Sequence, residues 1–580
     1  MATSIHLASP LSYTHREGQV HRYMHLNHWK KDILYFSVHF QSKKFSFKLY
    51  SMPHRTISHP TSLRCFTTNC SEELHGCHEK DFVSSGVSAP NDLQRSNILL
   101  DSSSNPIHDK NYFERELQDF FIEVKTMLKK GDINGTIDLL QANYEAVKEQ
   151  MDAGVKGMEQ AAILDIIALG YMGIGDFKLV EYMLNMLNEI VSGVKNGEPL
   201  LDSVLMHMGS MYAALGKLEE ALLAYRRSHE ILEIIFGKQS PFLIVPLLGM
   251  AKVFGSIGRT KKAVEVYDRA LNILETSRGA ESEDVVLPLF GLGNLLIKEG
   301  KASDAESSFK RILSIYTKLY GENDGRVGMA MCFLAHAMCA KGDVDEAIRL
   351  YRNGLQVIKH SKYMDLDDDI MEKMRIDLAE LLHVAGREHE GRRLLEECLL
   401  ISEKYKGNEH PSSVTHLLNL ATSYSHSKNF VEAERLLRTS LRIMLKTVDP
   451  DDQSITVPML HLAVTLYHLK QDEEAELLAL EAIRIREKAF GEESLPVGEA
   501  LDCLASIQSR SRKDDGEVLA ILKRVLSIQE KELGHESEDV MITLKKVLFY
   551  LDKLGKKDES LPLQRRLSML RTKNKQYVQS

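Results

Sequence analysis

The stretch LMHMGSMYAALGKLEEALLAY at residues 205–225 contains the pattern that decides the fold. Apolar residues recur with a helical period on both sides of Gly216, so this glycine predicts a turn between two helices. Small residues stand seven places before the turn, at Gly209, and five places after it, at Ala221. Because a side chain larger than a methyl group would push crossing helices apart, the pattern predicts a tightly packed helical hairpin.

The same pattern recurs along residues 113–575, and its turn residues return every 41–44 positions. The turns are predicted at Gly131, Gly175, Gly216, Gly258, Gly300, Gly342, Gly386, Lys428, Lys470, Lys513 and Gly555. Glycine closes such a turn readily because it adopts positive φ, so Lys428 and Lys470 predict strained or alternative turns. Eleven turns in one register predict an all-α tandem array of about twenty-two helices.

The small residues at these offsets, with Tyr212 and Tyr424 four places before their turns, resemble the tetratricopeptide repeat, although the period is longer than the usual ~34 residues. The run Gly-Asn-Glu-His-Pro at 407–411, followed by Asn-Leu-Ala at 419–421, resembles the connector and helix start of the kinesin light chain group. The resemblance implies a tetratricopeptide-like α-solenoid, a right-handed superhelix of about eleven helix-turn-helix repeats. It also implies a concave groove that takes a peptide or helix from a protein partner.

Residues 1–70 differ in composition from the rest of the chain. They contain fifteen Ser/Thr, eight His and nine Lys/Arg, but only two acidic residues, Glu17 and Asp32. Such a segment cannot bury a core, and its composition is typical of an organelle transit peptide. The first fifteen residues lack Lys and Arg, which favours a chloroplast or other plastid over a mitochondrion. A disordered tail of a cytoplasmic protein is the alternative interpretation.

We therefore predict a disordered transit peptide at 1–70, a linker at 71–112, a superhelical domain at 113–570 and a basic C-terminal tail at 571–580. The 510 residues after the transit peptide contain 64 Lys/Arg and 80 Asp/Glu, a formal charge of −16. An acidic body repels phosphate backbones, so we expect no nucleic-acid partner. No run of eighteen apolar residues occurs, so no membrane-spanning helix is predicted.

The resemblance directs the search for a binding site to the exposed positions of the first helix in each repeat. The predicted partner-binding residues of this groove are Asp377, Glu380, His383, Asn419, Thr422, His426, His461 and His468. Asn419 can donate and accept hydrogen bonds at once, which suits it to a partner's backbone amide. A histidine at such a position is most often only solvated or helix-capping. Several histidines facing one groove would instead bind an acidic segment more tightly as the pH falls.

The motifs of common enzyme classes are missing from the sequence. It contains no Gly-x-x-x-x-Gly-Lys-Ser/Thr phosphate loop, no His-Glu-x-x-His and no Gly-x-Ser-x-Gly. The cysteines form no Cys-x-x-Cys pair, and His426 and His468 lack neighbouring ligands for zinc. We therefore expect a protein that is not an enzyme and that uses no cofactor and no metal.

The predicted function is a non-catalytic scaffold or adaptor for protein partners, active in plastid assembly, translation or regulation, in a plant organellar member of the family. The alternative is a cytosolic kinesin light chain-related adaptor for cytoskeletal or vesicle cargo. The positions at which chaperone-tail-binding relatives grip a carboxylate hold Met206, Leu248 and Phe290 here, so that function is not expected. An RNA-associated helical repeat would need a basic groove, which this acidic body lacks. The oligomeric state is left open.

Overall fold

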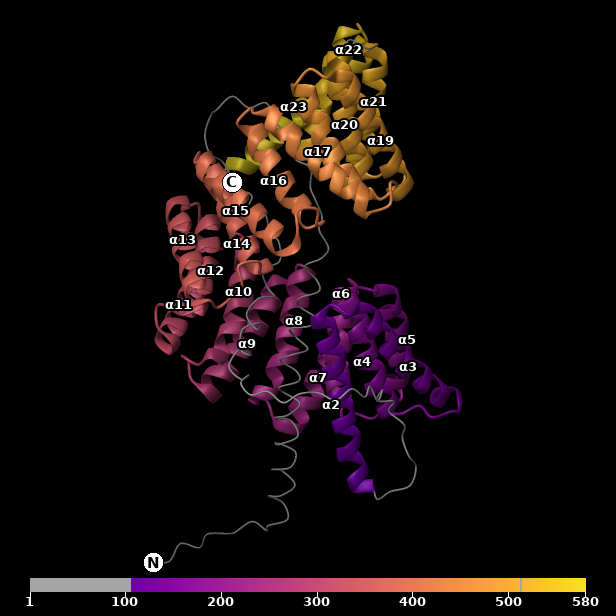
Figure 1. The fold of residues 1–580 in the computed structure, drawn as a ribbon, viewed down its shortest axis with the longest axis vertical. Coiled ribbons are helices and arrows are strands. Elements are labelled where there is room, and N and C mark those ends of the chain that lie inside the picture. The colour runs from indigo at the N-terminus through magenta and orange to yellow at the C-terminus, as the bar shows by residue number, and fades with distance from the viewer. Residues whose placement is uncertain (1–105, 512–513, 580) are drawn as a thin grey trace, which may run out of the picture. The chain divides into compact units, whose positions relative to one another are not determined.

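The computed structural model describes residues 106–511 and 514–579, and within them it contains twenty-two α-helices and no strand (Figure 1). The predicted all-α array of paired helices, consistent with an α-solenoid, is confirmed. The predicted transit peptide, most of the predicted linker and the turn at Lys513 lie outside the described residues. Helix α2 begins at Pro106, seven residues before the predicted start of the array, and the last helix continues to Gln579 through the predicted basic tail.

The chain divides into two compact units, which we call unit 1 and unit 2, with the division after Met364. Unit 1 contains α2 (Pro106–Lys130), α3 (Ile133–Asp152), α4 (Met158–Ile174), α5 (Phe177–Ser192), α6 (Leu201–Ala214), α7 (Leu218–Phe236), α8 (Ile244–Ser256), α9 (Thr260–Arg278), α10 (Val286–Lys298), α11 (Ala302–Tyr320), α12 (Gly325–Lys341) and α13 (Val344–Ser361). Unit 2 contains α14 (Asp369–Val384), α15 (Glu388–Lys406), α16 (Ser413–His426), α17 (Phe430–Thr447), α18 (Thr456–His468), α19 (Asp472–Phe490), α20 (Leu495–Arg510), α21 (Asp515–Leu533), α22 (Glu538–Lys553) and α23 (Lys557–Gln579).

The even-numbered helices precede the turn residues, and we call them A helices; the odd-numbered helices that follow are B helices. Short 3-10 helices lead into three A helices, at Pro241–Leu243, Glu283–Val285 and Gln453–Ile455. None of the described helices combines the length and low charge that would let it cross a membrane.

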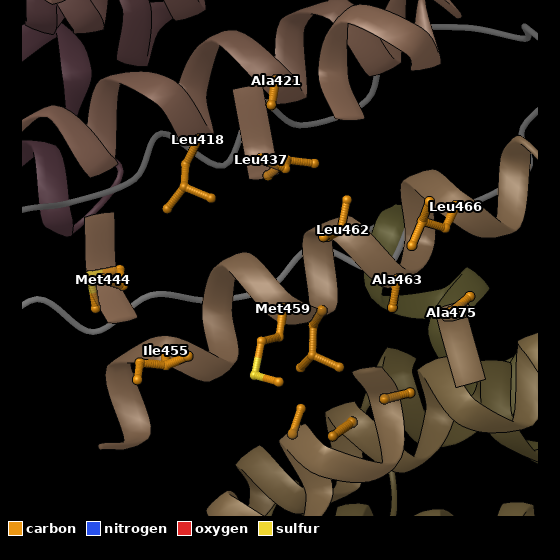
Figure 2. Close-up of a cluster of buried hydrophobic side chains, with 14 of the residues drawn as sticks. Leu418, Ala421, Leu437, Met444, Ile455, Met459, Leu462, Ala463, Leu466 and Ala475 are labelled. Carbon is orange, nitrogen blue, oxygen red and sulfur yellow. The ribbon is translucent and has the colours of Figure 1, made fainter. Parts of the chain in front are cut away.

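The small residues lie where the packing argument placed them. The alanines five places after the turn, from Ala221 to Ala475, have no solvent-exposed surface. A Cβ atom added to Gly209 of α6 would lie 2.8 Å from Cε1 of Tyr225 on α7, which is too close for two carbon atoms. In unit 2, Ala421, Ala463 and Ala475 lie between the larger side chains of one continuous apolar core (Figure 2). These contacts let each A helix approach its B helix closely enough to exclude water.

A column of arginines, eleven places after the turn, ties several repeats to the connector before them. Arg227 donates hydrogen bonds to the carbonyl oxygens of Val191, at 3.0 Å, and Val194, at 2.7 Å. Arg311 binds the Ala280 carbonyl at 2.7 Å, and Arg524 and Arg566 bind equivalent carbonyls in unit 2. Each of these arginines satisfies backbone oxygens at the C-terminal end of a preceding B helix or in the connector after it.

The turn residues have the backbone conformation that the sequence predicts. The glycines from Gly131 to Gly386 that close the A helices have φ between 73° and 91°, and Lys428 and Lys470 have φ of 61° and 64°. A residue with a Cβ atom is strained in this left-handed region.

We expect Lys470→Gly to stabilise unit 2 by about 1 kcal/mol, because glycine relieves the left-handed strain that a Cβ atom causes. Urea denaturation followed by circular dichroism measures the change. The reverse substitution, Gly386→Lys, is the matched control and should destabilise the same unit by a similar amount. A lower urea midpoint for Lys470→Gly would contradict the strain argument.

Candidate functional site

One position on the A helices of unit 2 brings together side chains with binding chemistry. Asp377, Asn419, His461 and Cys503 occur at intervals of forty-two residues, on α14, α16, α18 and α20, and all four are half-buried. We call these four residues the polar column. The first three were predicted from the sequence as groove residues, and the forty-two-residue spacing adds Cys503, which was not among the predicted groove residues.

Burial changes the protonation of the polar column. It raises the pKa of the Asp377 carboxyl to about 7, although the nearby Lys373 opposes the shift. Burial, together with the positive charge of Arg486, lowers the pKa of His461 to about 4. It raises the pKa of the Cys503 thiol to about 12. At neutral pH the column therefore presents a neutral imidazole, a thiol and a carboxyl that is close to half-protonated.

The buried Arg486 of α19 explains much of this environment. Its guanidinium donates to the Thr456 hydroxyl at 3.0 Å and to the Pro496 carbonyl, and it forms an ion pair with Glu499 at 3.2 Å. This charge, placed behind the A helices, disfavours a second positive charge on His461. The sequence offers no signal for the arrangement, because an arginine in a B helix normally reaches solvent.

Three members of the polar column have unused hydrogen-bonding capacity. The side chains of Asp377, Asn419 and His461 form no hydrogen bond or ion pair with any other residue that the structure describes. Next to them on α16, the Thr422 hydroxyl donates to the Leu418 carbonyl at 2.9 Å and keeps its acceptor lone pairs free. These side chains are partly open to solvent, so a ligand that reaches them can exchange hydrogen bonds with them in place of water.

Other predicted groove residues are used within the fold. His383 donates from Nδ1 to the Ala379 carbonyl at 2.6 Å, and its Nε2 accepts from the Ser423 hydroxyl at 2.6 Å. Arg392 from α15 also reaches Ser423 and lies over the Tyr424 ring, 4.3 Å from its centre. His383 therefore joins α14 to α16 as part of an internal network.

The remaining predicted residues lie near the turns or on the exposed surface. The His468 ring is stacked on Phe430, with the ring centres 4.4 Å apart. Glu380 and His426 are exposed. The surrounding residues nevertheless remove part of the water around each side chain, which raises the pKa of Glu380. The same partial loss of hydration, together with the nearby His383, lowers the pKa of His426. Because the pKa values of His426 and His461 are both lowered, the idea that these histidines bind an acidic segment more tightly under mild acid is not favoured.

In unit 1, other side chains of the fold occupy the space at the equivalent positions. His207, nine places before its turn as Asp377 is, is buried and hydrogen-bonded through Nδ1 to the buried Asp165, which stands ten places before the preceding turn. The next two positions are Gly249 and Gly291, where an added Cβ atom would lie 2.5 Å from Tyr225 and 2.6 Å from Tyr267. The open polar column is thus a property of unit 2. Within residues 106–511 and 514–579, no three His, Cys, Asp or Glu side chains are arranged to hold a metal ion.

A sequence model of the tetratricopeptide repeat family matches residues 200–276, 285–359 and 370–446, and a second model of that family matches residues 459–495. No curated protein matches the chain. Among solved structures, a kinesin light chain candidate with nearly identical TPR-like repeats from Podosopora anserina is 22% identical, with 36% of this chain and 98% of that chain covered and a TM-score of 0.33.

Two further solved structures also match parts of the chain. BtubC from P. vanneervenii is 16% identical, with 43% of this chain and 93% of that chain covered and a TM-score of 0.31. A signal transduction ATPase with a tetratricopeptide repeat sensor from Pyrococcus horikoshii is 16% identical, with 67% of this chain and 57% of that chain covered and a TM-score of 0.42.

We expect Asp377→Asn to change the pH dependence of stability. A carboxyl whose pKa is raised from 3.8 to about 7 on folding holds its proton in the folded state, so its contribution to stability falls as the pH rises through this window. Asp377→Asn removes this loss, and the variant should gain stability relative to the unmodified protein between pH 5 and pH 8.

Urea denaturation at several pH values checks this prediction. Asn419→Ala is the control, since it changes the same column without removing a titratable group, and its effect on stability should not vary with pH. A pH-independent difference for Asp377→Asn would show that the carboxyl is ionised normally.

Proposed function

We propose that this chain, in which tetratricopeptide repeat models match residues 200–276, 285–359, 370–446 and 459–495, is a non-catalytic scaffold that holds a segment of a partner protein along the polar column of unit 2. The proposal rests on one observation above the others. The side chains of Asp377, Asn419 and His461 are half-buried and have no hydrogen-bonding partner within the described chain. A partner's backbone would supply the missing donors and acceptors.

The geometry of repeats suits an extended segment. Packed helices lie about 8–10 Å apart, and an extended chain advances about 3.3 Å per residue. Every third residue of such a segment would therefore meet one residue of the column. Four column residues would then bind a segment of roughly ten residues, which is a common length for a linear recognition motif.

The chemistry of the column favours a segment without strong charge. His461 is neutral at physiological pH, Asn419 carries no charge, and Cys503 remains a thiol. Such groups exchange hydrogen bonds with peptide amides and with Ser, Thr, Asn or Gln side chains. Charged residues would have to lose hydration without finding an opposite charge. We therefore propose a polar, uncharged partner segment.

The composition of residues 1–70 supports a location for this function. We propose that the segment directs import into plastids, where the scaffold serves assembly, translation or regulation. Residues 1–90 fused to a fluorescent reporter should accumulate in the chloroplasts of leaf protoplasts. The same fusion with residues 2–70 deleted is the control and should stay in the cytosol. A diffuse cytosolic signal from the first fusion would favour a cytosolic adaptor instead.

We expect the double variant Asn419→Ala, His461→Ala to lose partners that bind the polar column, because it removes two of the three unsatisfied polar groups. Proximity labelling in protoplasts, quantified against the unmodified protein, should show at least a tenfold loss for those partners. Lys359→Ala, at an exposed position of α13 in unit 1, is the matched control. An unchanged set of labelled proteins would contradict the assignment of the column.

A further inference from the structure

The outward side of three consecutive B helices in unit 2 carries a second kind of surface. We propose that the exposed face of α15, α17 and α19 docks an acidic amphipathic helix of a partner protein. This surface, which we call the outer face, lies on the B helices and is separate from the polar column on the A helices. Its residues are Arg393, Leu400, Val431, Arg435, Arg438, Arg442, Leu445, Leu477, Leu480 and Arg484.

The repeat register lines up these residues in rows. The position seven places after the turn holds Arg393, Arg435 and Leu477, and the position fourteen places after it holds Leu400, Arg442 and Arg484. On α17 alone, Val431, Arg435, Arg438, Arg442 and Leu445 follow one another at steps of three or four residues, so they share one side of the helix. This stripe is about 21 Å long, or four turns.

The apolar members of the outer face are unusually exposed. Leu400, Val431, Leu445, Leu477 and Leu480 each leave between 45% and 69% of their surface open to solvent. Single exposed leucines need no explanation, but five on three adjacent helices, in one register, form a patch. An ion pair of 2.8 Å between Arg438 of α17 and Glu474 of α19 holds two of the helices side by side.

On α17, the acidic side chains are more buried than the arginines that they pair with. The three helices contain eleven Lys/Arg and thirteen Asp/Glu, so their net charge is close to zero. Glu432 and Glu434 of α17 expose 32% and 20% of their side chains, less than the 64% and 44% of their partners Arg435 and Arg438. Glu474 of α19, at 45%, is as exposed as Arg438. All the exposed charged residues of α17 are therefore cations, on a body that is acidic overall.

Two arginines of the outer face are available for a new partner. Arg393 and Arg442 form no ion pair or hydrogen bond with another residue that the structure describes. They stand on neighbouring B helices, with Leu400 of α15 in the same row as Arg442. Each arginine would bind one carboxylate of a partner helix, while the exposed leucines of the outer face would bury the partner's apolar side chains.

Unit 1 has no comparable stripe among its described B helices. The equivalent positions of α9 hold Lys261, Glu265, Asp268 and Asn272, and those of α11 hold Ser303, Ser307, Lys310 and Ser314. On α7, Leu223, Ile234 and Ile235 are exposed next to Arg226, but the acidic Glu230 lies between them and the neighbouring α9 does not extend the patch. The repeat fold by itself therefore does not require the apolar and cationic side chains of the outer face.

An acidic helix fits this surface better than a nucleic acid or a bilayer. Long-range attraction to a phosphate polymer or an anionic membrane requires a net positive field, and these three helices are nearly neutral in sum. Short-range pairing of carboxylates with exposed arginines requires only local complementarity. The four-turn stripe also matches a helix with apolar side chains at steps of three and four.

A labelled synthetic peptide tests the proposal with the full chain. The probe is an eighteen-residue helical peptide with leucines on one side and glutamates flanking them. The control peptide carries lysine in place of every glutamate. Fluorescence anisotropy should show the glutamate peptide binding at least tenfold more tightly than the lysine peptide. The double variants Arg393→Glu, Arg442→Glu and Leu400→Asp, Leu445→Asp should each weaken binding at least tenfold.

Two controls separate this surface from the rest of the protein. Leu223→Asp, Arg226→Glu makes the same kinds of change on α7 of unit 1, and Asn419→Ala changes the polar column; both should leave binding of the glutamate peptide unchanged. Circular dichroism should show unchanged helicity in all variants, since the altered side chains are exposed or, at Asn419, half-buried.

Three results would overturn the proposal. Equal binding of the two peptides would exclude charge complementarity, and equal loss in the α7 control would exclude a localised surface. Binding of phosphatidylcholine–phosphatidylserine vesicles that depends on Arg393 and Arg442, without binding of the glutamate peptide, would show that the partner is a membrane surface.

Discussion

The close approach of each A helix to its B helix is the contact on which the rest of the structure depends. It requires a side chain no larger than a methyl group at the crossing point, as at Gly209 and Ala221. One helical pair buries too little apolar surface to offset the entropy of ordering it, so stability comes from stacking pairs in series. The constraint therefore recurs in every repeat, and it imposes one register on the whole array.

A shared register has a consequence for function. Any position in one repeat lies beside the same position in the next, so residues forty-two apart form columns. The column of Asp377, Asn419, His461 and Cys503 is open and polar, whereas its counterpart in unit 1 is filled by a buried Asp165–His207 contact and by Tyr225 and Tyr267. One scaffold thus supports a packed column in one unit and a binding surface in the other, through substitutions at single positions.

The fold is most predictable from the sequence where interactions between residues close in the chain decide the local structure. The turns at Lys428 and Lys470 have the left-handed backbone that a turn at those positions requires. The predictions are least accurate at the ends of the helical array and for the candidate partner-binding residues. Helix α2 begins earlier than predicted, and His383 and His468 contact Ser423 and Phe430 instead of a free groove. Those contacts join residues about forty positions apart, so no local sequence pattern predicts them.

The sequence by itself determined the class of fold, the number of helices and the position of each turn within the described residues, because steric size and helical period act between residues close in the chain. Only the tertiary structure decided which polar residues remain without partners. Asp377 and Asp165 are the same residue type at neighbouring positions of the repeat, yet the side chain of one has no hydrogen-bonding partner and that of the other binds His207. The difference arises from side chains supplied by the neighbouring repeat, which set the burial, the pKa and the hydrogen bonding of each group.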